Sequence, residues 1–157
     1  MPLQFKLMAL FKRTSSDNTD FKKLVALLDK DLAIRDGDEH AFYAQFNKID
    51  SIRHVIVCYV DSKAVGAGGF KQYEMGIAEI KRMFVMPEYR GKGIALEILN
   101  QLENWAAESG FLECILETGN KQPEAIGLYH KVGYSIIPNY GQYENVENSI
   151  CMSKSIL

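Results

Sequence analysis

The segment with the clearest chemical potential is residues 83–95, MFVMPEYRGKGIA. An apolar run ends at a proline, and an arginine, two glycines around a lysine and a helix-forming run follow. A strand that passes through a glycine-rich turn into a helix directs several backbone N–H groups toward one point, because the first N–H groups of a helix have no partner within it. The helix dipole adds partial positive charge at that point. This pattern predicts a binding site for a phosphate or pyrophosphate group.

Two other phosphate-binding motifs do not fit this segment. A Walker loop has its lysine directly after the last glycine, whereas Lys92 lies between Gly91 and Gly93. A dinucleotide-binding fingerprint needs a third glycine and a downstream acidic residue in a parallel unit. Because glycine pairs also mark ordinary turns, the prediction depends on the preceding strand, the following helix and Arg90.

The turn resembles the acetyl-CoA loop of the GCN5-related N-acetyltransferase (GNAT) superfamily, whose core pattern is Arg/Gln-x-x-Gly-x-Gly/Ala. Residues 90–95, RGKGIA, match that pattern, and a Val-x-Pro step at 85–87 precedes them as in the family. The resemblance implies that acetyl-CoA is the co-substrate and that this turn and the strand before it bind it. The residues concerned are Met83, Phe84, Val85, Arg90, Gly91, Lys92, Gly93, Ile94 and Ala95.

A second matching segment is residues 118–134. The family commonly has Asn-x-x-Ala, then Leu-Tyr and then Gly-Tyr; here Ala125 and Tyr129 match, and Gln122 stands where asparagine is usual. Because Gln keeps the amide donor and acceptor on a longer arm, the resemblance implies that Gln122 and Ala125 contact the cofactor. It also implies that Tyr129 donates a proton to the departing CoA thiolate. A tyrosine that only packs against the core is the competing interpretation.

The group that accepts the amine proton is less well defined. The attacking amine must be neutral, so a carboxylate acting directly or through water would favour the reaction. Glu79 lies where some family members carry a catalytic glutamate and is the first candidate, although a salt bridge with Lys81 is an alternative role. Glu117, at the end of the neighbouring predicted strand, is the second candidate. A water relay with no dedicated base is the third.

The acceptor pocket is predicted to lie between the first two helices and the last hairpin. Tyr140 and Tyr143 lie on the connection 138–144, and Phe42 would form the opposite lip. Tyrosines exposed on a turn are the competing interpretation.

Composition limits the other classes of function. The 157 residues carry a formal net charge of −2, which argues against a nucleic-acid partner. The three cysteines and three histidines show no spacing typical of a metal site, so no metal is expected. The sequence contains neither a signal-peptide pattern nor an apolar run long enough to span a membrane. We therefore expect a cytoplasmic location and no membrane partner, and a homodimer is left open.

The elements that must position these residues follow an α+β order. Strands are predicted at 5–11, 54–60, 64–73, 77–86, 111–118, 134–137 and 146–154, and helices at about 16–35, 38–46, 94–109 and 123–132. This order is that of the GNAT fold, and the resemblance covers residues 55–154 well and the first fifty only by element order. It implies one domain over residues 1–157, with a twisted, mostly antiparallel central sheet of about six to seven strands and about four helices. Strands 77–85 and 111–118 would begin together and then splay to admit the acyl arm of the cofactor.

The sequence therefore predicts an acetyl-CoA-dependent N-acetyltransferase. The acetyl group would pass directly to a primary amine, which we expect to belong to a small molecule, within a ternary complex. A protein N-terminal or lysine acetyltransferase is one alternative. A non-catalytic acyl-CoA-binding module is another.

Overall fold

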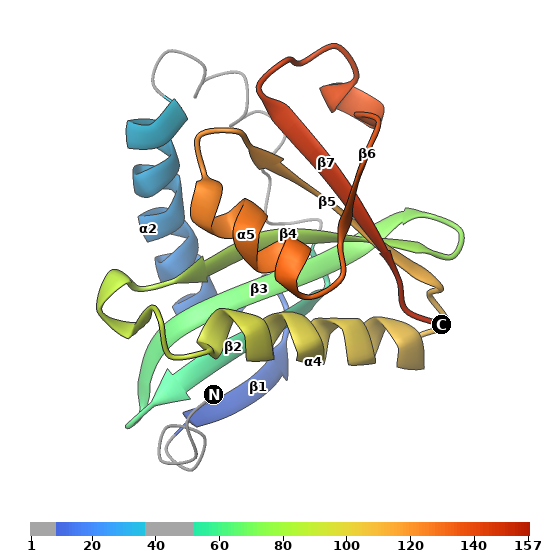
Figure 1. Ribbon diagram of the computed structural model, residues 1–157. Helices are drawn as coiled ribbons and strands as arrows, with labels where there is room; N and C mark the ends of the chain where they lie inside the picture. The colour runs from blue at the N-terminus through green and yellow to red at the C-terminus, as the bar shows by residue number, and fades with distance from the viewer. Residues whose placement is uncertain (1–8, 37–51) are drawn as a thin grey trace.

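The computed structural model describes residues 9–36 and 52–157, which form one seven-stranded sheet with helices on both faces (Figure 1). The strand order is β1-β2-β3-β4-β5-β7-β6, and every pair is antiparallel except β4 with β5. The strands are β1 (Ala9–Thr14), β2 (His54–Val60), β3 (Lys63–Glu74), β4 (Ile77–Val85), β5 (Glu113–Gly119), β6 (Ser135–Ile137) and β7 (Ser149–Ser155). The α-helices are α2 (Thr19–Asp36), α4 (Ile94–Glu108) and α5 (Pro123–Lys131), and the short 3₁₀ turns are η3 (Pro87–Tyr89) and η4 (Gly141–Tyr143). The predicted α+β class with a mostly antiparallel sheet is confirmed.

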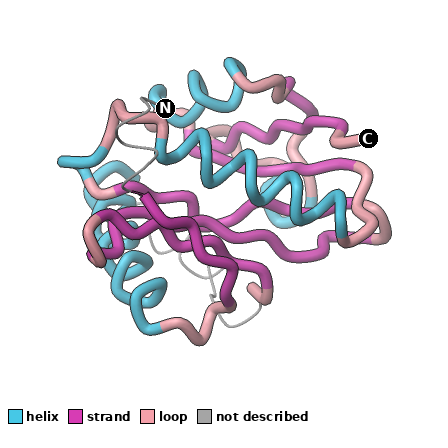
Figure 2. The backbone as a smooth tube through the Cα atoms, turned by 90° about the horizontal axis from the view of Figure 1, so that it is seen from below, coloured by secondary structure: helices cyan, strands magenta, loops and turns pink. Residues whose placement is uncertain are grey.

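Alternating side chains of the sheet fill two hydrophobic layers, one under α4 and one under α2. Ile56 and Cys58 of β2 belong to the layer that contains the apolar face of α4, whereas Val55 and Val57 belong to the layer that contains α2. The two helices lie on opposite sides of the strands, as Figure 2 shows from below. Since β2 is covered on both faces, its near-continuous apolar sequence has a direct physical cause.

Two glycines of β3 allow close approach of neighbouring chain segments. A Cβ at Gly68 would lie 2.4 Å from Met83 Sδ, and one at Gly69 would lie 2.9 Å from the His54 carbonyl oxygen. The register between β3 and β4 shifts between Ala67 and Gly69. The glycines of this strand therefore coincide with an irregularity in its pairing.

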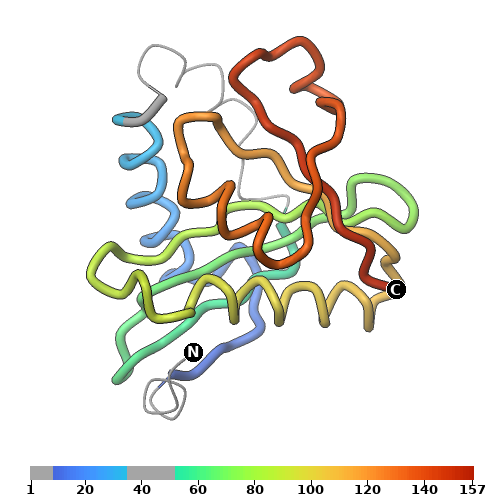
Figure 3. The backbone as a smooth tube through the Cα atoms, in the orientation of Figure 1, coloured from blue at the N-terminus to red at the C-terminus, as the bar shows by residue number. Residues whose placement is uncertain are grey.

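The parallel pair β4–β5 is short. It extends only from Ile77–Glu79 against Glu113–Ile115, after which β4 continues beside β3 and β5 continues beside β7. Figure 3 shows the two strands diverging, with α5 lying over the opening in this view. The predicted splay is confirmed.

The beginning of α2 differs from the sequence prediction. The Phe21 N–H donates to Asn18 Oδ1 at 2.9 Å, so Asn18 caps the helix, which begins at Thr19 and thus later than the predicted start at about residue 16. Strand β1 extends to Thr14, three residues beyond the predicted end. The predicted helix 38–46 and residues 5–8 of the predicted first strand lie outside the described residues.

Candidate active site

The splay between β4 and β5 borders two adjoining cavities. We name them the β5-side cavity and the loop-side cavity. Their shared lining residues are Leu28, Met83, Gln122, Ala125 and Tyr129. The β5-side cavity is further lined by Leu32, Ile80, Lys81, Arg82, Leu116, Glu117, Thr118, Gly119 and Tyr143. The loop-side cavity is further lined by Asp31, Phe84, Val85, Arg90, Gly91, Ala95, Glu124 and Leu128.

The glycine turn leads directly into the first turn of α4. Gly91 and Gly93 have φ values of +76° and +83°, a region that L-residues seldom occupy. Gly93 is the N-cap of α4 and offers no side-chain acceptor to the first helical N–H groups. A Cβ added at Gly91 would meet no atom within 4 Å, so this face of the turn is open. The geometry suits a bound anion.

Arg90 fixes the turn against the end of β4. Its Nε donates to the Val85 carbonyl oxygen at 2.8 Å, and its guanidinium carbon lies 5.5 Å from the centroid of the Phe84 ring. Both contacts are within the segment that the sequence predicted to bind the cofactor. Arg90 therefore orders the turn, in addition to lining the loop-side cavity.

Most residues predicted to bind the cofactor line one cavity. Those around the loop-side cavity are Met83, Phe84, Val85, Arg90, Gly91, Ala95, Gln122 and Ala125. Lys92, Gly93 and Ile94 are not part of that lining, and Ile94 is buried in the hydrophobic layer under α4. Among the described strands, the β5-facing edge of β4 has no strand partner beyond Glu79. Backbone groups along that edge are therefore available to a ligand.

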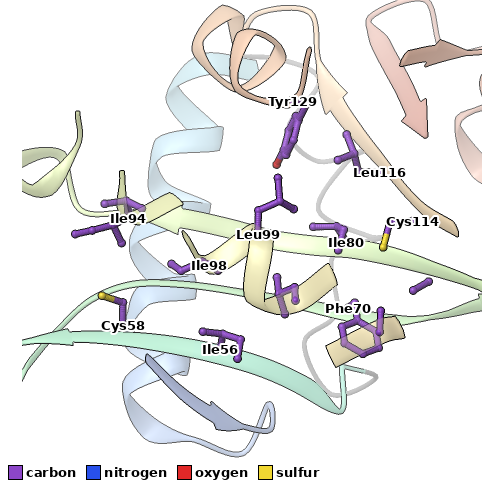
Figure 4. Close-up of a cluster of buried hydrophobic side chains, with 14 of the residues drawn as sticks. Ile56, Cys58, Phe70, Ile80, Ile94, Ile98, Leu99, Cys114, Leu116 and Tyr129 are labelled. Carbon is purple, nitrogen blue, oxygen red and sulfur yellow. The ribbon is translucent and has the colours of Figure 1, made fainter. Parts of the chain in front are cut away.

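Tyr129 lies where the two cavities join. It is 6% exposed, and Figure 4 shows its hydroxyl directed from α5 toward the sheet. Burial raises the pKa of Tyr129, and the negative charge of Glu117 raises it further. The phenol therefore keeps its proton at neutral pH, as a general acid must.

The two candidate carboxylates have different surroundings. Glu79 is 2% exposed, accepts a hydrogen bond from the Tyr140 hydroxyl at 2.7 Å and lines neither cavity. Glu117 lines the β5-side cavity and accepts a hydrogen bond from Ser149 Oγ at 2.6 Å. The structure thus brings Glu117 to the same cavity as Tyr129, and it places Glu79 beneath Tyr140.

The two described tyrosines that were predicted to bind the acceptor also differ in whether they line a cavity. Tyr143 is buried and lines the β5-side cavity, whereas Tyr140 lines neither cavity and packs edge-to-face against Tyr143, with ring centroids 5.8 Å apart. Phe42 lies outside the described residues.

Two charged residues of the β5-side cavity, Lys81 and Arg82, were not among the predicted site residues. Both are buried, at 8% and 7% exposed. A signal was present in the sequence, because two adjacent cations interrupt the otherwise apolar end of strand 77–85, IAEIKRMFV. Adjacent charges within a strand that is covered on both faces indicate a local departure from regular alternation.

Two kinds of feature are absent from residues 9–36 and 52–157. No group of three His, Cys, Asp or Glu side chains there is arranged to hold a metal ion. No helix in those ranges has the length and apolar character needed to cross a membrane. All three cysteines are buried and unpaired.

The split sheet and the glycine turn before α4 together form an architecture of the N-acetyltransferase type. The sequence matches the acetyltransferase (GNAT) family model over residues 21–134. The chain belongs to this family.

Characterised and uncharacterised bacterial relatives match parts of the sequence. It is 37% identical over 93 residues to an IAA acetyltransferase of Azospirillum brasilense, and the aligned region covers 59% of this chain and 61% of that protein. It is 36% identical over 80 residues to the uncharacterized N-acetyltransferase YjgM of Escherichia coli, and the aligned region covers 49% of this chain and 48% of that protein. The matches thus span about half to three-fifths of the length of these curated relatives.

Solved structures match over nearly the whole chain. A Klebsiella pneumoniae protein assigned as an acyl-CoA N-acyltransferase superposes with a TM-score of 0.80 at 24% identity, covering 96% of this chain and 99% of that one. The PaiA N-acetyltransferase of Thermoplasma acidophilum, solved in complex with coenzyme A, gives a TM-score of 0.70 at 19% identity, covering 94% and 98%. At these identities the likeness establishes the fold alone.

Proposed function

We propose that this chain is an acetyl-CoA-dependent N-acetyltransferase that acetylates a primary amine of a small molecule by direct transfer. The observation that carries the proposal is the position of Tyr129, a buried and protonated phenol at the junction of the two cavities. A cofactor arm entering from the loop side and an amine entering from the β5 side would meet beside it. Acetyl-CoA, when bound, supplies an activated thioester.

The loop-side cavity has the features that a pyrophosphate requires. The turn at Gly91 presents an open backbone face, and the first N–H groups of α4 receive no side-chain cap from Gly93. Both features favour an anion at the start of the helix. The unpaired edge of β4 beyond Glu79 would hold the acyl arm by backbone hydrogen bonds and polarise its carbonyl group.

Proton transfer is assigned to two side chains. Glu117 faces the β5-side cavity and would accept the amine proton, directly or through water. Tyr129 would donate its proton to the departing thiolate, because its raised pKa keeps it neutral until that charge develops. Glu79 is a second candidate base, and the amine proton would reach it through the hydroxyl of Tyr140.

A small molecule is the acceptor class that the described residues favour. The β5-side cavity lies between α2, through Leu28 and Leu32, and the connection that carries Tyr143. Side chains from both sides therefore restrict the space available, whereas a protein substrate needs an open groove for an extended segment. Peptides should be tested as acceptors in the same assay, because their acetylation would support a protein acetyltransferase instead.

The test is calorimetric titration with acetyl-CoA, followed by thiol release in the presence of a panel of amines and peptides. We expect saturable binding, and Tyr129→Phe should lower kcat by about 10²- to 10⁴-fold, the usual contribution of general acid catalysis, with little change in acetyl-CoA affinity. Tyr59→Phe is the matched control, because Tyr59 lines neither cavity and its hydroxyl donates to Asp20 at 2.8 Å. Saturable binding without thiol release for any acceptor would support the acyl-CoA-binding module instead.

A further inference from the structure

Lys81 and Arg82 are consecutive residues of β4, yet both line the β5-side cavity. A regular strand would place consecutive side chains on opposite faces. Here Arg82 has a φ of +61°, and the register against β3 moves from Gly69↔Lys81 to Ala67↔Phe84. One extra residue is thereby accommodated in β4 as a bulge, which re-aims the side chains.

Neither cation is fully partnered in the described part of the chain. Lys81 Nζ donates only to Tyr143 Oη, at 3.5 Å, and no carboxylate of those residues lies within ion-pair distance of it. Arg82 Nη2 pairs with Asp29 Oδ1 at 2.7 Å, but its Nε is buried without an acceptor. Burial lowers the pKa of Lys81, the charges of Glu79 and Glu117 partly oppose that effect, and the charges of Lys71 and Arg82 add to it. A buried donor or charge left in this state is unfavourable unless a ligand completes it.

The charge pattern indicates which ligand would complete it. Asp29 pairs with Arg82, whereas Glu79 and Glu117 act on Lys81 only at longer range, so among the described residues its ammonium group has no ion-pair partner at the cavity wall. A carboxylate carries one negative charge and several acceptor lone pairs, which suits an ammonium group and an unused guanidinium N–H. A diamine or polyamine would instead bring a second ammonium group toward Lys81.

From this arrangement we infer that the acceptor is a primary amine that also carries a carboxylate, as an amino acid does. Lys81 binds the carboxylate with support from Arg82, and the amine lies toward Glu117 and Tyr129 on the other wall. This inference rests on the proposed acetyltransferase function and specifies its substrate class.

The test compares acceptors that share a skeleton and differ in the carboxylate alone: tyrosine with tyramine, histidine with histamine, and lysine with cadaverine. Thiol release from acetyl-CoA gives kcat/KM for each. A hydrogen bond to a charged group corresponds to about a 10- to 100-fold preference, and we expect the carboxylated member of at least one pair to be favoured by that factor. The preference should reside mainly in KM, because Lys81 binds and does not transfer protons.

Variants then locate the preference. Lys81→Met should bring the ratio within a pair close to one, and Lys81→Arg should retain most of it because the cation is kept. Lys121→Met is the matched control, since Lys121 is an exposed lysine of the β5–α5 turn that lines neither cavity, and its ratio should equal that of the parent protein. Thermal unfolding of each variant verifies that its kcat/KM ratio was measured on folded protein. The ratio of the parent protein tests the carboxylate preference even if a variant does not fold.

The outcomes separate the two proposals. Thiol release with tyramine, histamine or cadaverine that equals or exceeds release with the carboxylated partners would overturn the inference and leave the acetyltransferase proposal standing. A parent preference that Lys81→Met does not change would overturn the assignment to Lys81. Acetyl-CoA binding without release for any amine would overturn both.

Discussion

Replacing Gly91 by alanine tests whether the glycine turn binds the cofactor, and the chain contains a matched control at Gly110. The two glycines have φ values of +76° and +94°, and a Cβ added at either would meet no atom within 4 Å. Gly91 lines the loop-side cavity and Gly110 ends α4 at its opposite terminus. The two substitutions therefore impose similar backbone strain, but only Gly91→Ala places a methyl group where the pyrophosphate would approach.

The magnitudes follow from this difference. A left-handed backbone conformation costs an L-residue about 1–2 kcal/mol, which corresponds to a fall in Tm of roughly 2–8 °C for a domain of this size, and we expect it in both variants. Loss of one hydrogen bond between a backbone N–H and a charged phosphate oxygen costs about 1.5–3 kcal/mol. The acetyl-CoA Kd of Gly91→Ala should therefore rise by about 10- to 100-fold, whereas that of Gly110→Ala should stay within about twofold of the parent.

The assay is calorimetric titration with acetyl-CoA at a temperature well below both Tm values, with circular dichroism to verify folding. Equal affinities for Gly91→Ala and the parent would refute the assignment of the turn as a pyrophosphate site. An equal loss of affinity in both variants would also refute it, because backbone strain alone would then explain the effect.

The remaining predictions concern the candidate bases and the partly buried His54. Glu117→Gln should lower kcat/KM in the thiol-release assay by about 10²-fold or more, and Glu79→Gln should lower it by much less, because Glu117 lines the β5-side cavity and Glu79 does not. The reverse order of the two effects would assign the base to Glu79. Burial lowers the pKa of His54, so the unfolded chain binds more protons than the folded protein below about pH 6.5, and stability should fall as the pH drops through that range. His54→Gln should flatten this acid-side slope in urea titrations at about pH 7.5 and pH 5.5. An unchanged slope in His54→Gln would show that other groups set it.

The part of the site that consists of backbone could be predicted from the sequence. Gly91 and Gly93 are required by positive φ values, and a sequence shows such positions directly because few other residues adopt them. Tyr129 was predicted from the resemblance to the GNAT pattern, since helical spacing alone is equally compatible with a tyrosine packed against the core. The same resemblance supplied the eight predicted cofactor-binding residues that line the loop-side cavity.

The part of the site that consists of side chains from distant segments could not be predicted in the same way. Glu79 is covered by Tyr140, which lies 61 residues further along the chain, and strand periodicity contains no information about that contact. Lys81 and Arg82 share a cavity only because β4 bulges, and a regular strand would have separated them. The acceptor side thus depends on tertiary contacts that no local pattern specifies.

The bulge connects a glycine of β3 with both halves of the site. Gly68 opposes the extra residue of β4, and the Sδ of Met83 occupies the space where a Cβ at Gly68 would lie, at 2.4 Å from it. A larger residue at Gly68 would displace Met83, which lines both cavities, and would disturb the conformation that turns Arg82 toward the β5 side. The lack of a side chain at Gly68 therefore permits the departure from regular pairing that brings Lys81 and Arg82 to one cavity wall. A core glycine that lines neither cavity can in this way shape the cavity in which we propose that the acceptor binds.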